Sequence, residues 1–270
     1  MDGRPIGFFD SGIGGVTSIP HIMRLLPNES IIFYGDTART PYGSKSEQTI
    51  KQFTLQIGEF LIKNNVKMIV IACNTVSSTA LELLRSTYPD IPVIGCISPT
   101  AREITKLCDS GSRIGIMATK ATVRSGAYEA KIKSYDDSLS IKSVACPAIV
   151  PLIEEGIIDN EIMDLTIRHY LDDFISENKI DTLVLGCTHY PLIADNLSRL
   201  YPGVRLISSS KEVATAVRME LETADLLAGE GTPKSTFYAS DLSDNFVEMI
   251  KLILGKDREE LNIKFKNLDI

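Results

Sequence analysis

Tryptophan is absent from this sequence, and histidine and cysteine are scarce, with three and five residues in a chain of 270. There is no Cys-x-x-Cys pair and no tight cluster of histidine and cysteine, so a structural zinc site has little support and we expect no metal. Five is an odd number for a disulfide framework, and a chain of this length does not need such staples. We therefore expect five free thiols.

An excess of basic residues is also missing. The formal net charge is −7, which argues against a nucleic-acid partner because that affinity rests mainly on Lys and Arg contacts to phosphates. No uninterrupted apolar run of about 18 residues occurs, and the N-terminus lacks an apolar segment of signal-peptide length. The expectation is a globular protein of the cytoplasm with no membrane partner.

Short apolar runs of β-prone residues alternate with segments of helical period, as is typical of parallel sheets covered by helices on both faces. The predicted strands are Ile6–Phe9, Ile31–Tyr34, Met68–Ala72, Pro92–Ile97, Ile114–Ala118, Val144–Cys146, Thr182–Gly186 and Val204–Ile207. One predicted helix carries apolar residues from Ile50 to Leu61 and is introduced by Ser44, with Glu47 at capping-box spacing. The fold class is α/β.

Two pairs of segments in this chain are similar in sequence. Residues 66–75 and 180–189 are each a buried strand ending in cysteine and small polar residues, and the strands at Ile6 and Ile114 repeat at nearly the same offset of about a hundred residues. We expect two similar parallel-sheet α/β domains related by pseudo-twofold symmetry, with the active site in the cleft between them. The expected domains are 1–97 plus 210–270, and 98–209. The last part of the chain is predicted to form helix 210–227, strand 235–238 and helix 241–254, and to return to the first domain.

Two cysteines occupy positions where chemistry is expected. Cys73 and Cys187 each follow a predicted strand, and ligands of open α/β sheets bind outside the carboxyl ends of the strands. One such cysteine alone would more often be a small buried hydrophobe, and we assign Cys96, Cys108 and Cys146 to the core on that ground. Two in equivalent positions favour a pair of opposed acid/base thiols, the arrangement that inversion of a carbon centre requires.

Polar residues near these cysteines could assist. Asp10 ends the first strand and His189 lies two residues after Cys187, so each could act on one thiol. The glycine-rich turn after Asp10 fails the dinucleotide pattern because Thr17 occupies the third glycine position, and we interpret it as a tight turn that aims Asp10 inward.

Four hydroxyl and amide residues stand at predicted helix starts, where they could cap a helix, bind an anionic substrate or do both. They are Ser11, Asn74, Thr75 and Thr188. The loop from Gly35 to Gly43 is by default a surface loop and, in the functional interpretation, a substrate lid.

At these residues the sequence resembles the glutamate racemase family. The motifs that carry the resemblance are Asp10-Ser11-Gly12, the run from Gly35 to Gly43, Ala72-Cys73-Asn74-Thr75 and Gly186-Cys187-Thr188-His189-Tyr190-Pro191, in the family's order over most of the chain. The resemblance implies a cleft between two α/β domains, no metal or other cofactor, a homodimer, and interconversion of L- and D-glutamate for peptidoglycan synthesis.

The resemblance also assigns roles. Cys73 would deprotonate D-glutamate and Cys187 L-glutamate, assisted by Asp10 and His189 respectively. A further carboxylate falls on Glu154 or its neighbour Glu155, and Glu154 is favoured. The implied substrate contacts are Asp10, Ser11, Pro41, Tyr42, Gly43, Asn74, Thr75, Thr119, Thr122, Thr188 and His189. One departure is Thr40, where many members have cysteine.

Other functions stay open at this point. The nearest is a racemase of the same superfamily that acts on aspartate or another amino acid. A two-domain protein that binds an anion without turning it over is a second alternative, and a redox protein that uses both thiols is a third.

Overall fold

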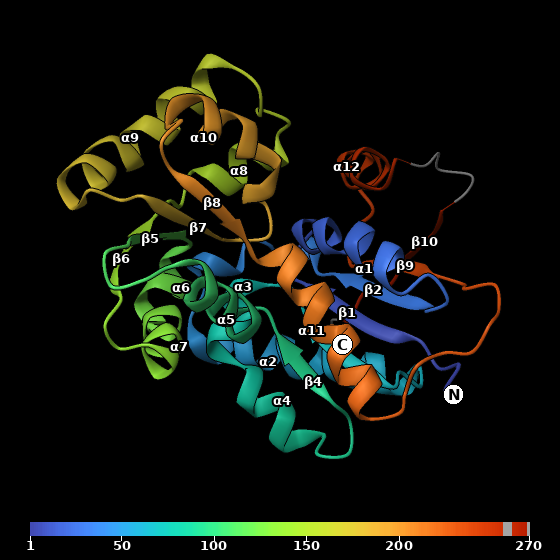
Figure 1. Ribbon diagram of the computed structural model, residues 1–270. Helices are drawn as coiled ribbons and strands as arrows, with labels where there is room; N and C mark the ends of the chain where they lie inside the picture. Colours follow the sequence, from blue (N-terminus) through green and yellow to red (C-terminus); the bar gives the residue numbers. More distant parts are fainter. Residues whose placement is uncertain (256–260, 269–270) are drawn as a thin grey trace.

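The structure, a computed structural model, describes residues 1–255 and 261–268. Its strands form two sheets, one of six strands in the order β10-β9-β2-β1-β3-β4 and one of four in the order β6-β5-β7-β8, and every strand pair is parallel. The run β2-β1-β3-β4 of the first sheet and the whole second sheet therefore have the same strand order, as the similar sequence segments predict. In Figure 1 the second sheet lies at the upper left and the first at the right, with α11 running from β8 back toward the first sheet.

Nine of the ten strands in the described residues overlap a predicted strand, and the tenth was not predicted. They are β1 (Ile6–Asp10), β2 (Ile31–Gly35), β3 (Met68–Ile71), β4 (Val93–Gly95), β5 (Arg113–Ala118), β6 (Ser140–Ala145), β7 (Thr182–Gly186), β8 (Arg205–Ser208), β9 (Thr236–Ala239) and β10 (Asn262–Phe265). Alternate residues of β3 enter different hydrophobic cores, Met68 and Val70 one and Ile69 and Ile71 the other. A strand buried on both faces has no polar face, which explains its continuous apolar run and confirms the α/β class.

Helices occupy most of the connections. They are α1 (Ile19–Leu25), α2 (Glu47–Lys63), α3 (Asn74–Thr79), α4 (Leu81–Thr87), α5 (Ile97–Leu107), α6 (Lys120–Ser125), α7 (Ala127–Tyr135), α8 (Ile149–Glu154), α9 (Glu161–Asn178), α10 (Ala194–Leu200), α11 (Ser209–Thr223) and α12 (Asp244–Leu254). The described residues also form four short 3-10 helices, η1 (Gly14–Ser18), η2 (Thr37–Arg39), η3 (Tyr42–Ser44) and η4 (Tyr190–Ile193). None of the helices in the described part of the chain combines the length and the apolar character of a membrane span.

Three local predictions were wrong. The helix from Glu47 is capped by Ser46, whose hydroxyl accepts from the Thr49 amide, and Ser44 instead donates to the Pro41 carbonyl. The strand predicted to reach residue 97 stops at Gly95, because Ser77 accepts from the Cys96 amide and the chain turns into α5. The strand predicted at 144–146 is longer and starts at residue 140.

The chain after residue 209 returns to the first sheet. Strand β9 pairs with β2, and β10 pairs with β9 at the sheet edge. The domain boundaries at 97/98 and 209/210 stay a prediction, and residues 256–260 and 269–270 of the first predicted domain lie outside the described residues.

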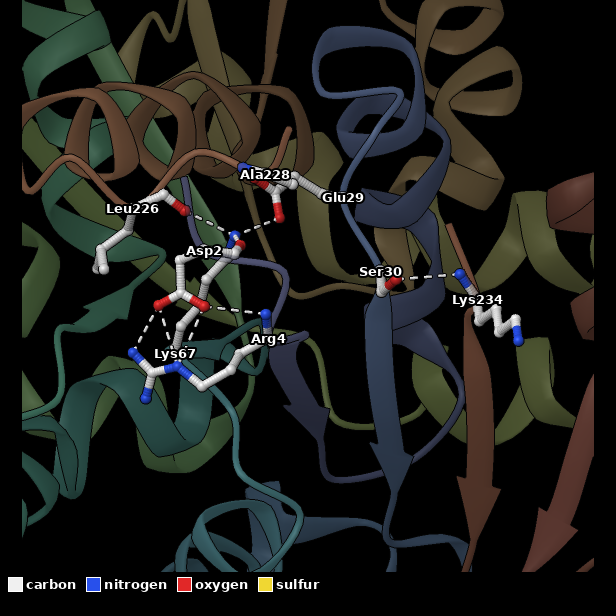
Figure 2. A network of polar contacts seen from close by, with 8 residues as sticks. All are labelled: Asp2, Arg4, Glu29, Ser30, Lys67, Leu226, Ala228 and Lys234. Carbon is white, nitrogen blue, oxygen red and sulfur yellow. Dashed lines mark hydrogen bonds and ion pairs between the residues drawn. The ribbon is translucent and has the colours of Figure 1, made fainter. Parts of the chain in front are cut away.

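A buried ion pair between Lys67 and Glu29 contacts this returning segment (Figure 2). It lies at the end of the first sheet opposite the cysteines. Lys67, immediately before β3, is fully buried and its Nζ lies 2.6 Å from Glu29 Oε2. The same ammonium donates to the carbonyl oxygens of Asp2 and Leu226, each at 2.7 Å, and Glu29 Oε1 accepts from the Ala228 amide at 2.8 Å. One charge thus joins the N-terminal segment, the start of β3 and the chain that follows α11.

Replacing Lys67 by methionine should lower the free energy of unfolding by about 3–5 kcal/mol, since removal of one partner leaves the other charge buried and unpaired. Urea denaturation of the variant and the wild type measures this difference. Lys51→Met is the matched control, because Lys51 pairs with Glu47 at an exposed helix surface and should contribute only about 0.2–0.5 kcal/mol. Equal losses in the two variants would contradict the importance given to burial.

Candidate active site

A single cavity lies where the carboxyl ends of both sheets meet. Its volume, including the opening, is about 650 Å³. The chain enters it directly after β1, β3, β5 and β7, the first and third strands of each sheet. The lining residues are Ser11, Thr40, Pro41, Tyr42, Gly43, Ser44, Cys73, Asn74, Thr75, Thr119, Lys120, Cys146, Pro147, Val150, Cys187, Thr188 and His189.

The two predicted thiols both line this cavity. Cys73 follows β3 of the first sheet and Cys187 follows β7 of the second, and both side chains are buried. Cys73 Sγ lies 3.4 Å from Ser11 Oγ, and Cys187 Sγ lies 3.8 Å from His189 Nδ1. All five cysteines are free thiols, as predicted. Equivalent strands of the two sheets therefore deliver one thiol each to the same space.

Asp10 lies behind the cavity wall rather than in it. It is fully buried, and its carboxylate accepts from the Gly12 amide at 3.1 Å and from the Thr188 hydroxyl at 3.2 Å. Burial raises the pKa of Asp10 above its usual range, with nearby His189 opposing the shift. Burial, with a contribution from Asp10, also raises the pKa of the Cys73 thiol, so Cys73 carries its proton at neutral pH.

His189 lies beside the other thiol, Cys187. The His189 imidazole favours its charged form, whereas Asp10 favours its neutral form. Burial opposes an imidazolium, but hydrogen bonds with Cys187 and Glu154 outweigh it and raise the pKa of His189 to about 10. His189 Nε2 lies 3.1 Å from Glu154 Oε1, whereas Glu155 is exposed at the end of α8. The structure thus brings Glu154, and not Glu155, to the site, although Glu154 stands behind His189 and does not line the cavity.

Three threonine hydroxyls form a cluster at the start of α6. Thr119 Oγ1 lies 2.9 Å from Thr75 Oγ1 and 3.1 Å from Thr122 Oγ1, and it also accepts from the Thr122 amide as the cap of the helix. Thr75 and Thr119 line the cavity, but Thr122 is buried behind them. The predicted contact from Thr122 is therefore indirect in this arrangement.

The predicted lid is anchored from beneath. Tyr42 lines the cavity, yet its hydroxyl turns away and donates to the buried carboxylate of Asp36. Asp36 also pairs with Arg39 at 2.7 Å and accepts from the Ser240 hydroxyl at 2.9 Å, which ties the loop to the chain after β9. Pro41, Tyr42 and Gly43 thus face the site with their backbone and ring surfaces, not with the phenol group.

Several lining residues escaped the sequence prediction. Thr40 was noted only as a departure, and its hydroxyl contacts Glu154 Oε1 at 3.4 Å. Cys146 is buried as predicted but also forms part of the cavity wall, next to Pro147 and Val150. Lys120 follows Thr119 directly after β5, a strand-end position like that of the thiols, and this was the signal that could have found it. Ser44 is the remaining addition.

The arrangement suits proton transfer on a small anionic molecule. Two thiols reach one cavity with unlike partners. Cys73 lies near Asp10, a carboxyl group whose burial favours its neutral form, and Cys187 lies beside the His189 imidazolium. Amide, hydroxyl and ammonium groups from Asn74, Thr75 and Lys120 supply donors for carboxylates. Among the described residues no group of three or more His, Cys, Asp or Glu side chains could hold a metal ion.

Comparisons with known proteins agree with this geometry. Residues 20–217 match the family model described as Asp/Glu/Hydantoin racemase. The glutamate racemase of Persephonella marina is 43% identical over 252 residues, covering 93% of this chain and 94% of that protein. The glutamate racemase of Aquifex aeolicus is 41% identical over 254 residues, covering 94% and 95%. The crystal structure of glutamate racemase from Francisella tularensis in complex with D-glutamate superposes with a TM-score of 0.92 at 36% identity, covering 100% and 99%.

The raised pKa of His189 should be visible by NMR of the histidine side chains. We expect the His189 imidazole to stay protonated at pH 8, while burial lowers the pKa of His21 so that its ring is neutral at pH 7. Glu154→Gln should move the His189 midpoint to lower pH because it removes the anion that stabilises the imidazolium. A His189→Asn spectrum assigns the signal, and a midpoint near the ordinary value of about 6.5 in the wild type would contradict the geometry.

The same shift predicts a direction for stability. Because the folded protein holds the His189 proton more tightly than the unfolded chain, the stability from this group is complete below about pH 6.5 and is lost as the pH rises through about 10. Urea midpoints of the wild type and His189→Asn should therefore converge between those two pH values. Midpoints that stay equally far apart across the window would contradict the assignment.

Proposed function

This chain belongs to the Asp/Glu/Hydantoin racemase family, and from that premise we propose that it interconverts L-glutamate and D-glutamate by proton transfer at the α-carbon. The observation that carries the proposal is the cavity itself, in which Cys73 from the first sheet and Cys187 from the second lie against one enclosed space. Inversion needs a base on one face of the carbon and an acid on the other, and two thiols on equivalent strand ends supply that pair.

The proposed reaction on L-glutamate begins at Cys187. Its thiolate takes the α-proton, so the C–H bond breaks, an S–H bond forms, and the electron pair stays on the substrate as a carbanion. The thiol of Cys73 then gives its proton to the opposite face of the carbon. His189 places a positive charge beside Cys187 and Glu154 stabilises that charge, while Asp10 assists Cys73. D-glutamate reacts by the reverse sequence.

The lining residues bind the substrate in this proposal. Asn74, Thr75, Thr119 and Lys120 offer donors to the two carboxylates. Thr188 contacts the substrate while its hydroxyl donates to Asp10, and Ser11 contacts Cys73 near the reacting carbon. The anchored loop Pro41–Gly43 covers the cavity and excludes water. Exclusion of water strengthens the electrostatic interactions that stabilise the carbanion.

The cellular setting is part of the proposal. We extend to this chain the use of D-glutamate for peptidoglycan synthesis, a cytoplasmic location and a homodimer as properties of the proposed enzyme. Size-exclusion chromatography with light scattering tests the dimer directly.

Incubation of the purified protein with D-glutamate in D2O, without added cofactor, should give L-glutamate with deuterium at the α-carbon, since a thiol that exchanges with solvent returns the proton. Optical rotation and NMR follow the two products. Aspartate is the discriminating control, because it is one methylene shorter and should turn over much more slowly. Comparable turnover of aspartate would reassign the substrate, and no exchange with either amino acid would leave a protein that binds an anion without catalysis.

Cys73→Ser and Cys187→Ser should each lower kcat/KM by about 10²–10⁴-fold, the range that a positioned acid or base contributes. Serine keeps the size of the side chain but is a far weaker acid, so ligand binding should largely persist. Cys108→Ser is the matched control, since Cys108 is buried away from the cavity beside Thr182. Activity near that of the control in either variant would remove that cysteine from the mechanism.

A further inference from the structure

A buried tyrosine contacts the active site from outside its lining. Tyr128 lies on α7, is 2% exposed, and donates from its hydroxyl to Asn74 Oδ1 at 2.5 Å. Asn74 is also 2% exposed and lines the cavity one residue after Cys73. Tyr128 itself does not line the cavity, so its hydroxyl reaches the site through Asn74.

The partner atom sets the direction of this hydrogen bond, because a phenol can donate or accept whereas the amide oxygen Oδ1 can only accept. Burial raises the pKa of Tyr128, so the phenol keeps its proton at any pH at which the protein functions. A neutral phenol that donates occupies the carbonyl oxygen of the Asn74 amide, and the two N–H groups point the other way. At that end of the amide, Asn74 Nδ2 donates to Ser209 Oγ at 3.5 Å. At least one amide hydrogen remains available to a ligand.

We propose that Tyr128 is a positioning residue that holds the Asn74 amide with its N–H groups toward a substrate carboxylate. The inference rests on the proposed function, because it takes glutamate as the anion in the cavity. An amide has one donor end and one acceptor end of nearly equal size, so packing alone does not select its orientation. With the carbonyl turned inward the same side chain would repel a carboxylate, and the tyrosine hydroxyl selects the attractive orientation.

The bond also joins the layers around the two sheets. Asn74 begins α3, directly after β3 of the first sheet, whereas α7 follows β5 and α6 of the second. Ser209, the other neighbour of the amide, starts α11, the helix that carries the chain back to the first sheet. The Asn74 amide therefore contacts residues from α7 and α11, two helices that follow strands of the second sheet.

Tyr128→Phe tests the proposal by removing one oxygen atom and no ring atom. We expect KM for D-glutamate to rise about tenfold with kcat changed much less, because an N–H donor to a charged group is lost from binding in the ground and transition states alike. Tyr34→Phe is the matched control. Tyr34 is fully buried and its hydroxyl donates to the Lys266 carbonyl at 3.0 Å, outside the cavity. An unchanged KM in Tyr128→Phe, or an equal rise in both variants, would overturn the proposal.

A double-mutant cycle tests whether the tyrosine acts through the amide. In an Asn74→Ala background Tyr128→Phe should have no further effect on KM, because no amide remains to be oriented. A tenfold effect that persists in that background would overturn the proposal.

A measurement without turnover separates this proposal from the proposed function. The Asn74 side-chain amide resonances of the ligand-free protein should shift in Tyr128→Phe and stay unchanged in Tyr34→Phe, whatever the substrate. Resonances that stay in place in Tyr128→Phe would overturn the role of Tyr128. Failure of the wild type to racemise glutamate would instead overturn the proposed function.

Discussion

The active site depends on the closure of two sheets onto each other along their carboxyl edges. The Thr188 hydroxyl donates to Asp10 at 3.2 Å, and Thr17 Oγ1 donates to the Thr188 carbonyl at 3.1 Å, so two hydrogen bonds join the turn after β1 to the turn after β7. This close approach also requires glycine at position 14, since a Cβ at Gly14 would lie 2.5 Å from His189 Nδ1. The glycine-rich turn thus allows close contact between domains rather than the binding of a phosphate.

The neighbouring residues make the two thiols differ. Both side chains are buried, but Cys187 lies 3.8 Å from His189, whose raised pKa favours a positive charge beside that thiol. Beside Cys73, the buried Asp10 adds a carboxyl group whose own ionisation is disfavoured. Equivalent strand ends of the two sheets therefore hold thiols with unlike neighbours, Asp10 near Cys73 and His189 beside Cys187.

The sequence predicts the parts of this structure that local chemistry determines. Continuous apolar runs mark strands such as Ile6–Asp10 and Met68–Ile71 because they are buried on both faces, and the paired cysteines follow from the strand ends. Strand β10 gave no such signal, since Asn262–Phe265 lies at the sheet edge and is mostly exposed.

Contacts between distant segments were beyond prediction. Glu154 and Glu155 are alike in sequence, and only the rotation of about 100° per residue along α8 decides that Glu154 meets His189. Cys146 in the cavity wall and the anchoring of Tyr42 by Asp36 likewise depend on how separate elements pack.

The unlike surroundings of Cys73 and Cys187 meet a thermodynamic limit in the proposed reaction. Two enantiomers have the same free energy in water, so their equilibrium constant is one and the ratio kcat/KM must be identical for L- and D-glutamate. The His189 side of the cavity cannot make the enzyme more efficient in one direction. It can only change kcat and KM by the same factor. The enantiomer that meets the resting protonation state then has a lower KM and also a lower kcat. The asymmetry of the site then governs which hand of glutamate occupies it when both are abundant.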